Sequence, residues 1–138
     1  MNLATLIAKR AEEGRPIRVG MIGAGKFGTM FLAQAERQRG IHIIGICDLN
    51  PEATRSNLAL ANWNLERYAA KSLDTAAKNG TSHVGDNWEA LVNHPAVEII
   101  IECTGNPMAA VTHILRAFDQ GKHVINATVE ADAFCGPG

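Results

Sequence analysis

The sequence contains few cysteines and no cysteine motif. Cys47, Cys103 and Cys135 are odd in number and far apart, and no Cys-x-x-Cys pair occurs. Neither a disulfide framework nor a zinc site of the usual spacing is therefore supported. Cys47 and Cys103 lie in apolar segments, and we expect them to be core residues, not nucleophiles.

The chain also lacks the features of membrane, exported and nucleic-acid-binding proteins. It has no apolar run of the roughly 18 residues that a membrane span needs. Its amino terminus lacks the charged start and long apolar stretch of a signal peptide. The net charge is −1, from 13 Lys and Arg against 14 Asp and Glu, with none of the basic blocks that nucleic-acid binding favours. We expect a cytoplasmic protein that contacts neither membranes nor nucleic acids.

What the sequence does contain is typical of one globular domain. Hydrophobic residues make up 46% and charged residues 20% of its 138 residues. A chain of this length can bury about two thirds of the surface that it exposes when unfolded, which is enough to form a core without disulfide bonds.

Apolar and glycine patterns predict an alternation of strands and helices. Strands are expected at 17–22, 41–47, 82–84, 97–103 and 123–129. Helices are expected at 2–13, from the glycine-rich turn to about 38, within 51–79 as one long or two shorter helices, from 86 to 95, and from 107 to 121. The alternation favours a doubly wound parallel α/β sheet of the Rossmann type, with strand order 3-2-1-4-5. Residues 1–15 would form an amino-terminal helical extension, and residues 16–138 the Rossmann domain.

Three helix starts carry capping signals. Asn50-Pro51 and Asn106-Pro107 each combine a capping side chain with a proline suited to the first helical position. Asp86 and Glu89 have the spacing of a capping box. The residues expected on the buried face of the last helix are Met108, Val111, Leu115 and Phe118.

The segment Gly23-Ala24-Gly25-Lys26-Phe27-Gly28 matches the pattern G-x-G-x-x-G. It follows a predicted strand and precedes a predicted helix, which is the setting of a dinucleotide-binding loop. Gly23 would permit the tight turn, Gly25 the approach of a pyrophosphate, and Gly28 close packing of helix on strand. The phosphates would lie at the helix amino terminus, where free N–H groups favour an anion. The alternative is a purely structural glycine turn.

Asp48 ends the second strand, 20 residues after Gly28. A carboxylate there accepts hydrogen bonds from the adenosine ribose in dinucleotide-binding domains, and Leu49 follows it directly. Its charge would repel a 2′-phosphate and so favours NAD over NADP. Arg55 could instead reach such a phosphate, although a solvated helix residue is the simpler interpretation. Asp48 could also be an ordinary surface residue before the Asn50-Pro51 turn.

The loops after the fourth and fifth strands should border the same site. Ligands of open parallel sheets bind beyond the carboxyl ends of the strands at the switch point of the strand order. Thr104 and Gly105 are therefore expected to contact the nicotinamide-side ribose. Past the fifth strand, Glu130 and Asp132 are candidates for metal binding, substrate binding or catalysis, or are solvated strand ends.

We assign no catalytic role to the other polar and aromatic residues. Glu102 interrupts an apolar strand and is either a buried, paired carboxylate or one that faces the cleft. Trp63 and Trp88 are expected to be packing residues. The five histidines are scattered at element ends and give no catalytic candidate: His42, His83, His94, His113 and His123.

Three segments together resemble a known family: 19–28 (VGMIGAGKFG), 101–107 (IECTGNP) and 121–132 (GKHVINATVEAD). They are similar to the amino-terminal domain of homoserine-dehydrogenase-like oxidoreductases, which often carry a carboxyl-terminal SAF domain. The group includes 1-deoxy-D-xylulose 5-phosphate reductoisomerase-like proteins. The strand after Gly121 lacks the lysine that homoserine dehydrogenases carry after an Ala-Asn pair, which weakens homoserine itself as the expected substrate.

The resemblance implies an oxidoreductase that transfers hydride between a nicotinamide cofactor and a small polar carbonyl or hydroxy compound, either phosphorylated or not. Its reductoisomerase-like members imply NADPH and a divalent metal. The glycine loop, Asp48, Thr104, Gly105 and Asn126 would contact the cofactor, and Glu130 and Asp132 would lie at the entrance to the substrate site. The expected substrate domain is not found in these residues, so this chain alone would be inactive. The alternative function left open is a non-catalytic dinucleotide-binding or sensing module. A homo-oligomer is a candidate assembly in either case.

Overall fold

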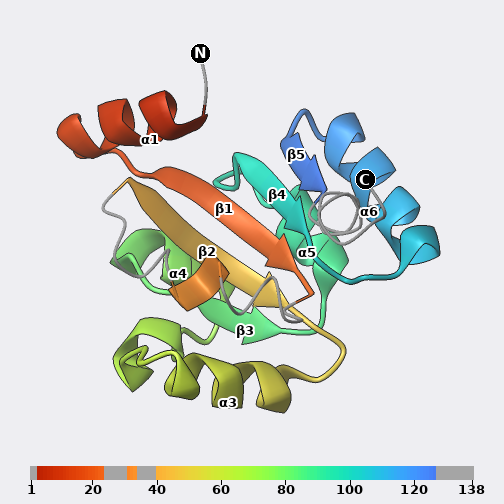
Figure 1. The fold of residues 1–138 in the computed structure, drawn as a ribbon, viewed down its shortest axis with the longest axis horizontal. Helices are drawn as coiled ribbons and strands as arrows, with labels where there is room; N and C mark the ends of the chain where they lie inside the picture. Colours follow the sequence, from red (N-terminus) through yellow and green to blue (C-terminus); the bar gives the residue numbers. More distant parts are fainter. Residues whose placement is uncertain (1–2, 24–30, 34–39, 127–138) are drawn as a thin grey trace, which may run out of the picture.

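The computed structural model describes residues 3–23, 31–33 and 40–126. In this part of the chain, five strands form one parallel sheet in the order β3-β2-β1-β4-β5 (Figure 1). The strands are β1 Ile17–Ile22, β2 Ile41–Cys47, β3 His83–Gly85, β4 Ile99–Glu102 and β5 His123–Asn126. The predicted Rossmann-like class and strand order are confirmed. The strand order reverses beside β1, because β2 lies on one side of it and β4 on the other.

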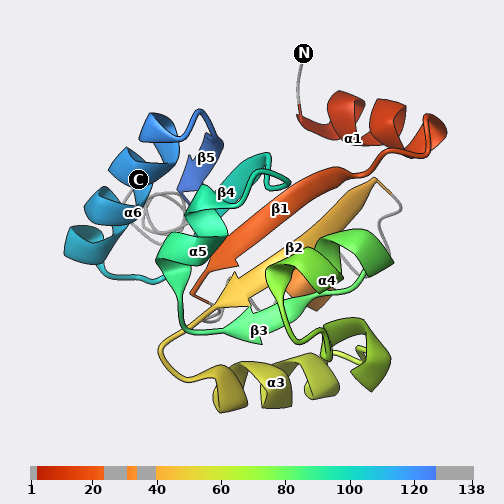
Figure 2. The ribbon, with the colours of Figure 1, turned by 180° about the vertical axis from the view of Figure 1, so that it is seen from behind.

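The helices lie in layers on both faces of the sheet. Their bounds are α1 Leu3–Glu12, α3 Pro51–Leu60, α4 Leu73–Asn79, α5 Trp88–Asn93 and α6 Pro107–Asp119, with the short helix η1 at Leu65–Tyr68. Figure 2 shows α4 and α5 in front of the sheet. Leu58 of α3 belongs to the apolar cluster on one face, and Leu91 of α5 belongs to the cluster on the other. Because both faces are covered, β2 and β4 are almost continuously apolar.

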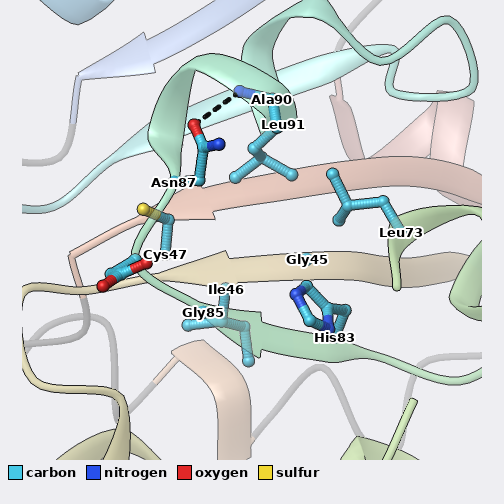
Figure 3. A pocket seen from close by; sticks show the side chains of 10 residues that line it. Gly45, Ile46, Cys47, Leu73, His83, Gly85, Asn87, Ala90 and Leu91 are labelled. Carbon is cyan, nitrogen blue, oxygen red and sulfur yellow. Dashed lines mark hydrogen bonds between the residues drawn. The ribbon is translucent and has the colours of Figure 1, made fainter. Parts of the chain in front are cut away.

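Glycines in two neighbouring strands make room for a helix. Gly20 pairs with Gly45 across β1 and β2, and Leu91 of α5 packs over both. A Cβ atom at Gly45 would lie 2.6 Å from Leu91 Cδ1 and 2.7 Å from Leu73 Cδ2. Figure 3 shows these two leucines directed toward β2 around a small pocket of about 110 Å³. The pocket is a packing gap between α4, α5 and the sheet.

The helix starts agree with most of the predicted capping signals. Asn50 caps α3 and Asn106 caps α6, in each case with a proline as the next residue. The capping-box prediction for α5 was wrong by one residue, because Asn87 and not Asp86 accepts the hydrogen bond, from Ala90 N. The predicted segment 51–79 is divided into α3, η1 and α4 by turns. The first of these turns places Asn62 at a left-handed φ of 65°.

The predicted buried face of α6 was wrong. Met108 is 82% exposed and Phe118 is 61% exposed, and Val111 and Leu115 are exposed as well. The helix instead turns Ala110, His113 and Ala117 toward the sheet. Small side chains let the helix axis approach β4 and β5 closely, so the stripe of large apolar residues faces outward.

Helix α1 is joined to Glu98, the residue before β4, by a bidentate ion pair. Arg10 donates from both terminal nitrogens to the Glu98 carboxylate, at 3.0 and 2.9 Å. Glu98 also accepts a hydrogen bond from Arg18 N at 3.0 Å. Burial acts to raise the pKa of Glu98, but the bonds from Arg10 and Arg18 outweigh it and hold the pKa below its ordinary value. None of the helices in the described ranges is long and apolar enough to cross a membrane.

We predict that Glu98→Gln lowers the free energy of unfolding by about 1 kcal/mol at neutral pH, because the pair is partly exposed and solvent screens it. A lowered carboxylate pKa stabilises the fold above the unfolded pKa, and that contribution is lost as the pH falls through the folded value. The difference between wild type and variant should therefore shrink below about pH 4. Urea unfolding at several pH values measures it, with the exposed Glu66→Gln as control. An equal difference at every pH would contradict this assignment.

Candidate cofactor site

The carboxyl ends of the central strands surround a cavity of about 440 Å³, which we call the edge cavity. It lies where the strand order reverses, with β1 and β2 on one side and β4 on the other. This is the position at which open parallel sheets bind their ligands. The residues that line the edge cavity are Ile22, Gly23, Cys47, Asp48, Leu49, Asp86, Trp88, Cys103, Thr104, Asn106, Ala109 and His113.

Gly23 joins the strand ends on both sides of β1. Its N–H donates to Cys47 O at 2.6 Å, and the preceding Ile22 O accepts from Cys103 N at 2.7 Å. Its φ is +82°, and a Cβ atom would lie 2.7 Å from Thr104 N and 2.8 Å from Cys103 C. Glycine is required at this position for two reasons, the left-handed backbone and the close approach of two main chains.

Two carboxylates stand at the end of the cavity formed by β2 and β3. Asp48 is half-buried, and its N–H donates to Gly85 O at 2.9 Å, which ties the ends of the two strands together. Asp48 Oδ1 accepts from Asn50 N at 3.1 Å, so the carboxylate is oriented by the turn that begins α3. Asp86 directly follows β3 and lines the same cavity. This end of the cavity therefore carries concentrated negative charge.

Arg55 is not positioned as a phosphate ligand. One terminal nitrogen donates to Glu52, and the other donates to Val84 O at 3.2 Å. These bonds hold the guanidinium against α3 and β3, and Arg55 is not among the described residues that line the edge cavity. The geometry favours the simpler of the two interpretations, a helix residue satisfied by local partners.

The loop between β4 and α6 closes the other side of the cavity. Thr104 is half-buried, and its hydroxyl oxygen accepts from Asn106 N at 3.2 Å. The Asn106 side chain accepts from both Met108 N and Ala109 N, so it caps α6 while it lines the cavity. The loop is thus held rigidly beside Gly23.

Beneath this loop lies a buried pair of titratable side chains. Glu102, at the end of β4, is fully buried, and its Oε1 accepts from Thr104 N at 2.8 Å. Its Oε2 is hydrogen-bonded to Nδ1 of His113 on α6. The ring of His113 packs on Trp88, with 4.5 Å between the ring centroids. The open question about Glu102 is resolved in favour of a buried, paired carboxylate, whose partner lines the cavity.

The structure brings together some of the predicted site residues. Gly23, Asp48, Leu49 and Thr104 line the edge cavity, whereas Gly105 and Asn126 are not among the described residues that do so. Asn126 lies on β5 opposite Glu102 in the strand register. Six candidates lie outside the described residues, and their roles stay predictions: Gly25, Lys26, Phe27, Gly28, Glu130 and Asp132.

The sequence reasoning missed three polar or aromatic side chains of the edge cavity: Asp86, Trp88 and His113. Asp86 and Trp88 bracket Asn87 just after β3, so the rule that ligands bind at strand ends could have found them. His113 lies 11 residues after Glu102 and in the second turn of α6, and only the tertiary structure brings the two together. Trp88 does pack, as predicted, but it packs against His113 and also lines the cavity.

The two cysteines that the structure describes are core residues, as expected. Cys47 and Cys103 are both buried. Burial raises the pKa of the Cys47 thiol to about 12, so the thiolate needed for nucleophilic attack is scarce at neutral pH. Among the described residues, no group of three or more His, Cys, Asp and Glu side chains could hold a metal ion.

Comparisons with known proteins place this geometry in context. Residues 17–126 match the profile of the Gfo/Idh/MocA group, described as an oxidoreductase family with an NAD-binding Rossmann fold. A homoserine dehydrogenase of Methylobacillus glycogenes is 29% identical over 115 residues, which cover 82% of this chain and 25% of that protein.

Solved structures share the fold. A homoserine dehydrogenase from Thiobacillus denitrificans superposes with a TM-score of 0.59 at 21% identity, covering 88% of this chain and 26% of that one. A biliverdin reductase from Synechocystis sp. PCC 6803, solved with biliverdin and NADP+, gives a TM-score of 0.58 at 18% identity, covering 79% and 28%. The chain thus spans about a quarter of the length of these relatives.

We predict that Gly23→Ala lowers the free energy of unfolding by about 2 kcal/mol or more, because the alanine would have to adopt a left-handed backbone and its Cβ would clash with Thr104. Gly105→Ala is the matched control, because Gly105 also has a left-handed φ, of +71°, but its Cβ would meet nothing within 4 Å. The control should lose only about 1 kcal/mol. Urea unfolding compares the two. Equal losses would show that the close contact of Gly23 with Thr104 has no special importance.

Proposed function

The chain belongs to the oxidoreductase family with an NAD-binding Rossmann fold, and from that premise we propose that the edge cavity binds NAD in preference to NADP. The complete enzyme then transfers hydride between this cofactor and a small polar carbonyl or hydroxy compound. The observation that carries the cofactor preference is the pair of carboxylates, Asp48 and Asp86, at one end of the cavity.

The described residues fit the adenosine half of such a cofactor. The missing side chain of Gly23 lets the backbone of Thr104 pack directly against it, so that both residues line the cavity. Asp48 offers carboxylate oxygens to the ribose hydroxyls, and a carboxylate is a strong acceptor for hydroxyl donors. Asn50 and Gly85 orient this side chain and its backbone before any ligand arrives.

Charge explains the proposed preference for NAD. The 2′-phosphate of NADP would enter the end of the cavity where Asp48 already stands, with Asp86 on the next strand. Like charges at short range in a partly buried site repel strongly. Arg55, the cation that could have offset this repulsion, is held by Glu52 and by Val84 O. NADPH, which the resemblance to reductoisomerase-like proteins implies, is therefore the less favoured cofactor in this proposal.

The cofactor, when bound, donates or accepts the hydride, and the protein binds and orients it. Thr104 and Asn106 border the cavity on the β4 side. The relatives are about four times as long as the region they share with this chain. We therefore assign substrate binding and the general acid to other parts of the enzyme, with Glu130 and Asp132 as predicted residues at the substrate entrance.

We predict that the chain binds NADH at least about tenfold more tightly than NADPH. Asp48→Ser should weaken NADH binding by about fivefold to tenfold through loss of the ribose hydrogen bonds. The same change should weaken NADPH binding less or improve it, so the ratio of the NADPH to the NADH dissociation constant should fall. Titration followed by nicotinamide fluorescence gives both dissociation constants.

Asp119→Asn is the control for this series, since Asp119 is an exposed carboxylate at the end of α6 outside the cavity lining. It should retain the wild-type constants. Tighter binding of NADPH by the wild type would contradict the proposed preference. No binding of either nucleotide by the folded chain would overturn the proposed site.

A further inference from the structure

Glu102 fixes the hydrogen-bonding state of His113. The carboxylate is fully buried, one oxygen accepts from Thr104 N, and the other is bonded to His113 Nδ1. A carboxylate accepts hydrogen bonds and has no hydrogen to donate, so Nδ1 of His113 is the donor in this bond. With Nδ1 as donor, Nε2 of the neutral ring is the acceptor.

Nε2 therefore presents a lone pair to the edge cavity. His113 lines the cavity and is only 7% exposed. Within the described part of the chain, the hydrogen bond of its ring is the one from Nδ1. No buried side-chain nitrogen or oxygen of the described residues is left without a partner, so Nε2 is accessible, and the space that His113 lines is the edge cavity. A buried, oriented acceptor of this kind recognises a hydrogen-bond donor on a ligand.

The surroundings of His113 suit a flat aromatic base. Trp88 packs on its ring, and Ala109 lines the cavity one helical turn before it on α6. Leu49 is 99% exposed at the rim of the cavity, next to Asp48. Apolar side chains and one oriented polar group are the usual composition of a site that binds a planar ligand. A base attached to a ribose at Asp48 would enter the space between these walls.

We propose that His113 reads the adenine base of NAD, with Nε2 accepting a hydrogen bond from the exocyclic amino group. The proposal rests on the proposed function, because it needs the adenosine ribose at Asp48. In this arrangement Glu102 is a positioning residue: it touches no ligand and acts by fixing which nitrogen of His113 carries the proton. The pair would make the site specific for a 6-amino purine.

The first test compares NAD with nicotinamide hypoxanthine dinucleotide. The analogue differs at the base, where a carbonyl oxygen replaces the amino group, so an acceptor would face the Nε2 acceptor. In isothermal titration calorimetry at about pH 8, the wild type should bind NAD about tenfold more tightly. Equal affinities would overturn the proposal while leaving the proposed function intact.

Two variants tie the discrimination to this pair. In His113→Asn, the amide nitrogen stands where Nδ1 stood and can keep the bond to Glu102, but the Nε2 atom is gone. The ratio of the two affinities should fall to about two or less. In Glu102→Gln, the side-chain oxygen can keep the bond to Thr104 N while the amide donates to Nδ1. Nε2 then carries the proton, and the preference should reverse toward the hypoxanthine analogue.

His94→Asn is the matched control, because His94 is also bonded to an acidic side chain, Asp74, at 2.7 Å, but does not line the edge cavity. It should keep the wild-type ratio. A merely structural role of the Glu102–His113 pair would change stability but could not reverse the preference. An unchanged ratio in Glu102→Gln, which preserves the shape of the side chain, would overturn the proposal even if His113→Asn failed to fold. No binding of NAD by the folded wild type would overturn the proposed function and this proposal together.

Discussion

The rest of the site depends on how the ends of three neighbouring strands are joined. Gly23 donates to the end of β2, and Ile22 accepts from the start of the loop after β4. These two backbone bonds are possible because Gly23 has no side chain between it and Thr104. They place the β2 and β4 loops on opposite walls of one cavity, although Asp48 and Thr104 are 56 residues apart in the sequence. Parallel strands with right-handed crossovers bring their carboxyl ends to one edge, and the glycine closes that edge.

The buried carboxylate of Glu102 is the second constraint, and it links stability to recognition. Burying a charge is unfavourable unless hydrogen bonds compensate for it, and Glu102 has partners on both oxygens. One bond fixes the loop that borders the cavity, and the other fixes the helix that follows. A neutral apolar residue could fill the same space in β4, where the preceding three residues are isoleucines. The buried carboxyl group is therefore better explained by what it orients than by the stability it adds.

Features set by local sequence were predictable, and features set by pairing between distant elements were not. The strands, the caps at Asn50 and Asn106, and the parallel order follow from apolar runs, short polar side chains and the alternation of elements. The stripe from Met108 to Phe118 has helical spacing, but spacing alone does not say which face meets the sheet, and the small residues Ala110 and Ala117 do. Asp48 was found because a strand end and a glycine motif mark it. His113 was not found, because its candidate role depends on a hydrogen bond to a carboxylate on another element.

The central claim is that the carboxyl edge of the sheet, between β1, β2 and β4, binds a nicotinamide dinucleotide. The most direct measurement is a titration of the isotope-labelled chain with NAD, followed by the amide resonances in NMR spectra. The account predicts saturable shifts that are largest for amides lining the edge cavity, among them Gly23, Asp48, Asp86 and Thr104. Shifts centred instead on the small pocket between α4, α5 and β2, around Leu73 and His83, or no shifts in the folded chain, would contradict it.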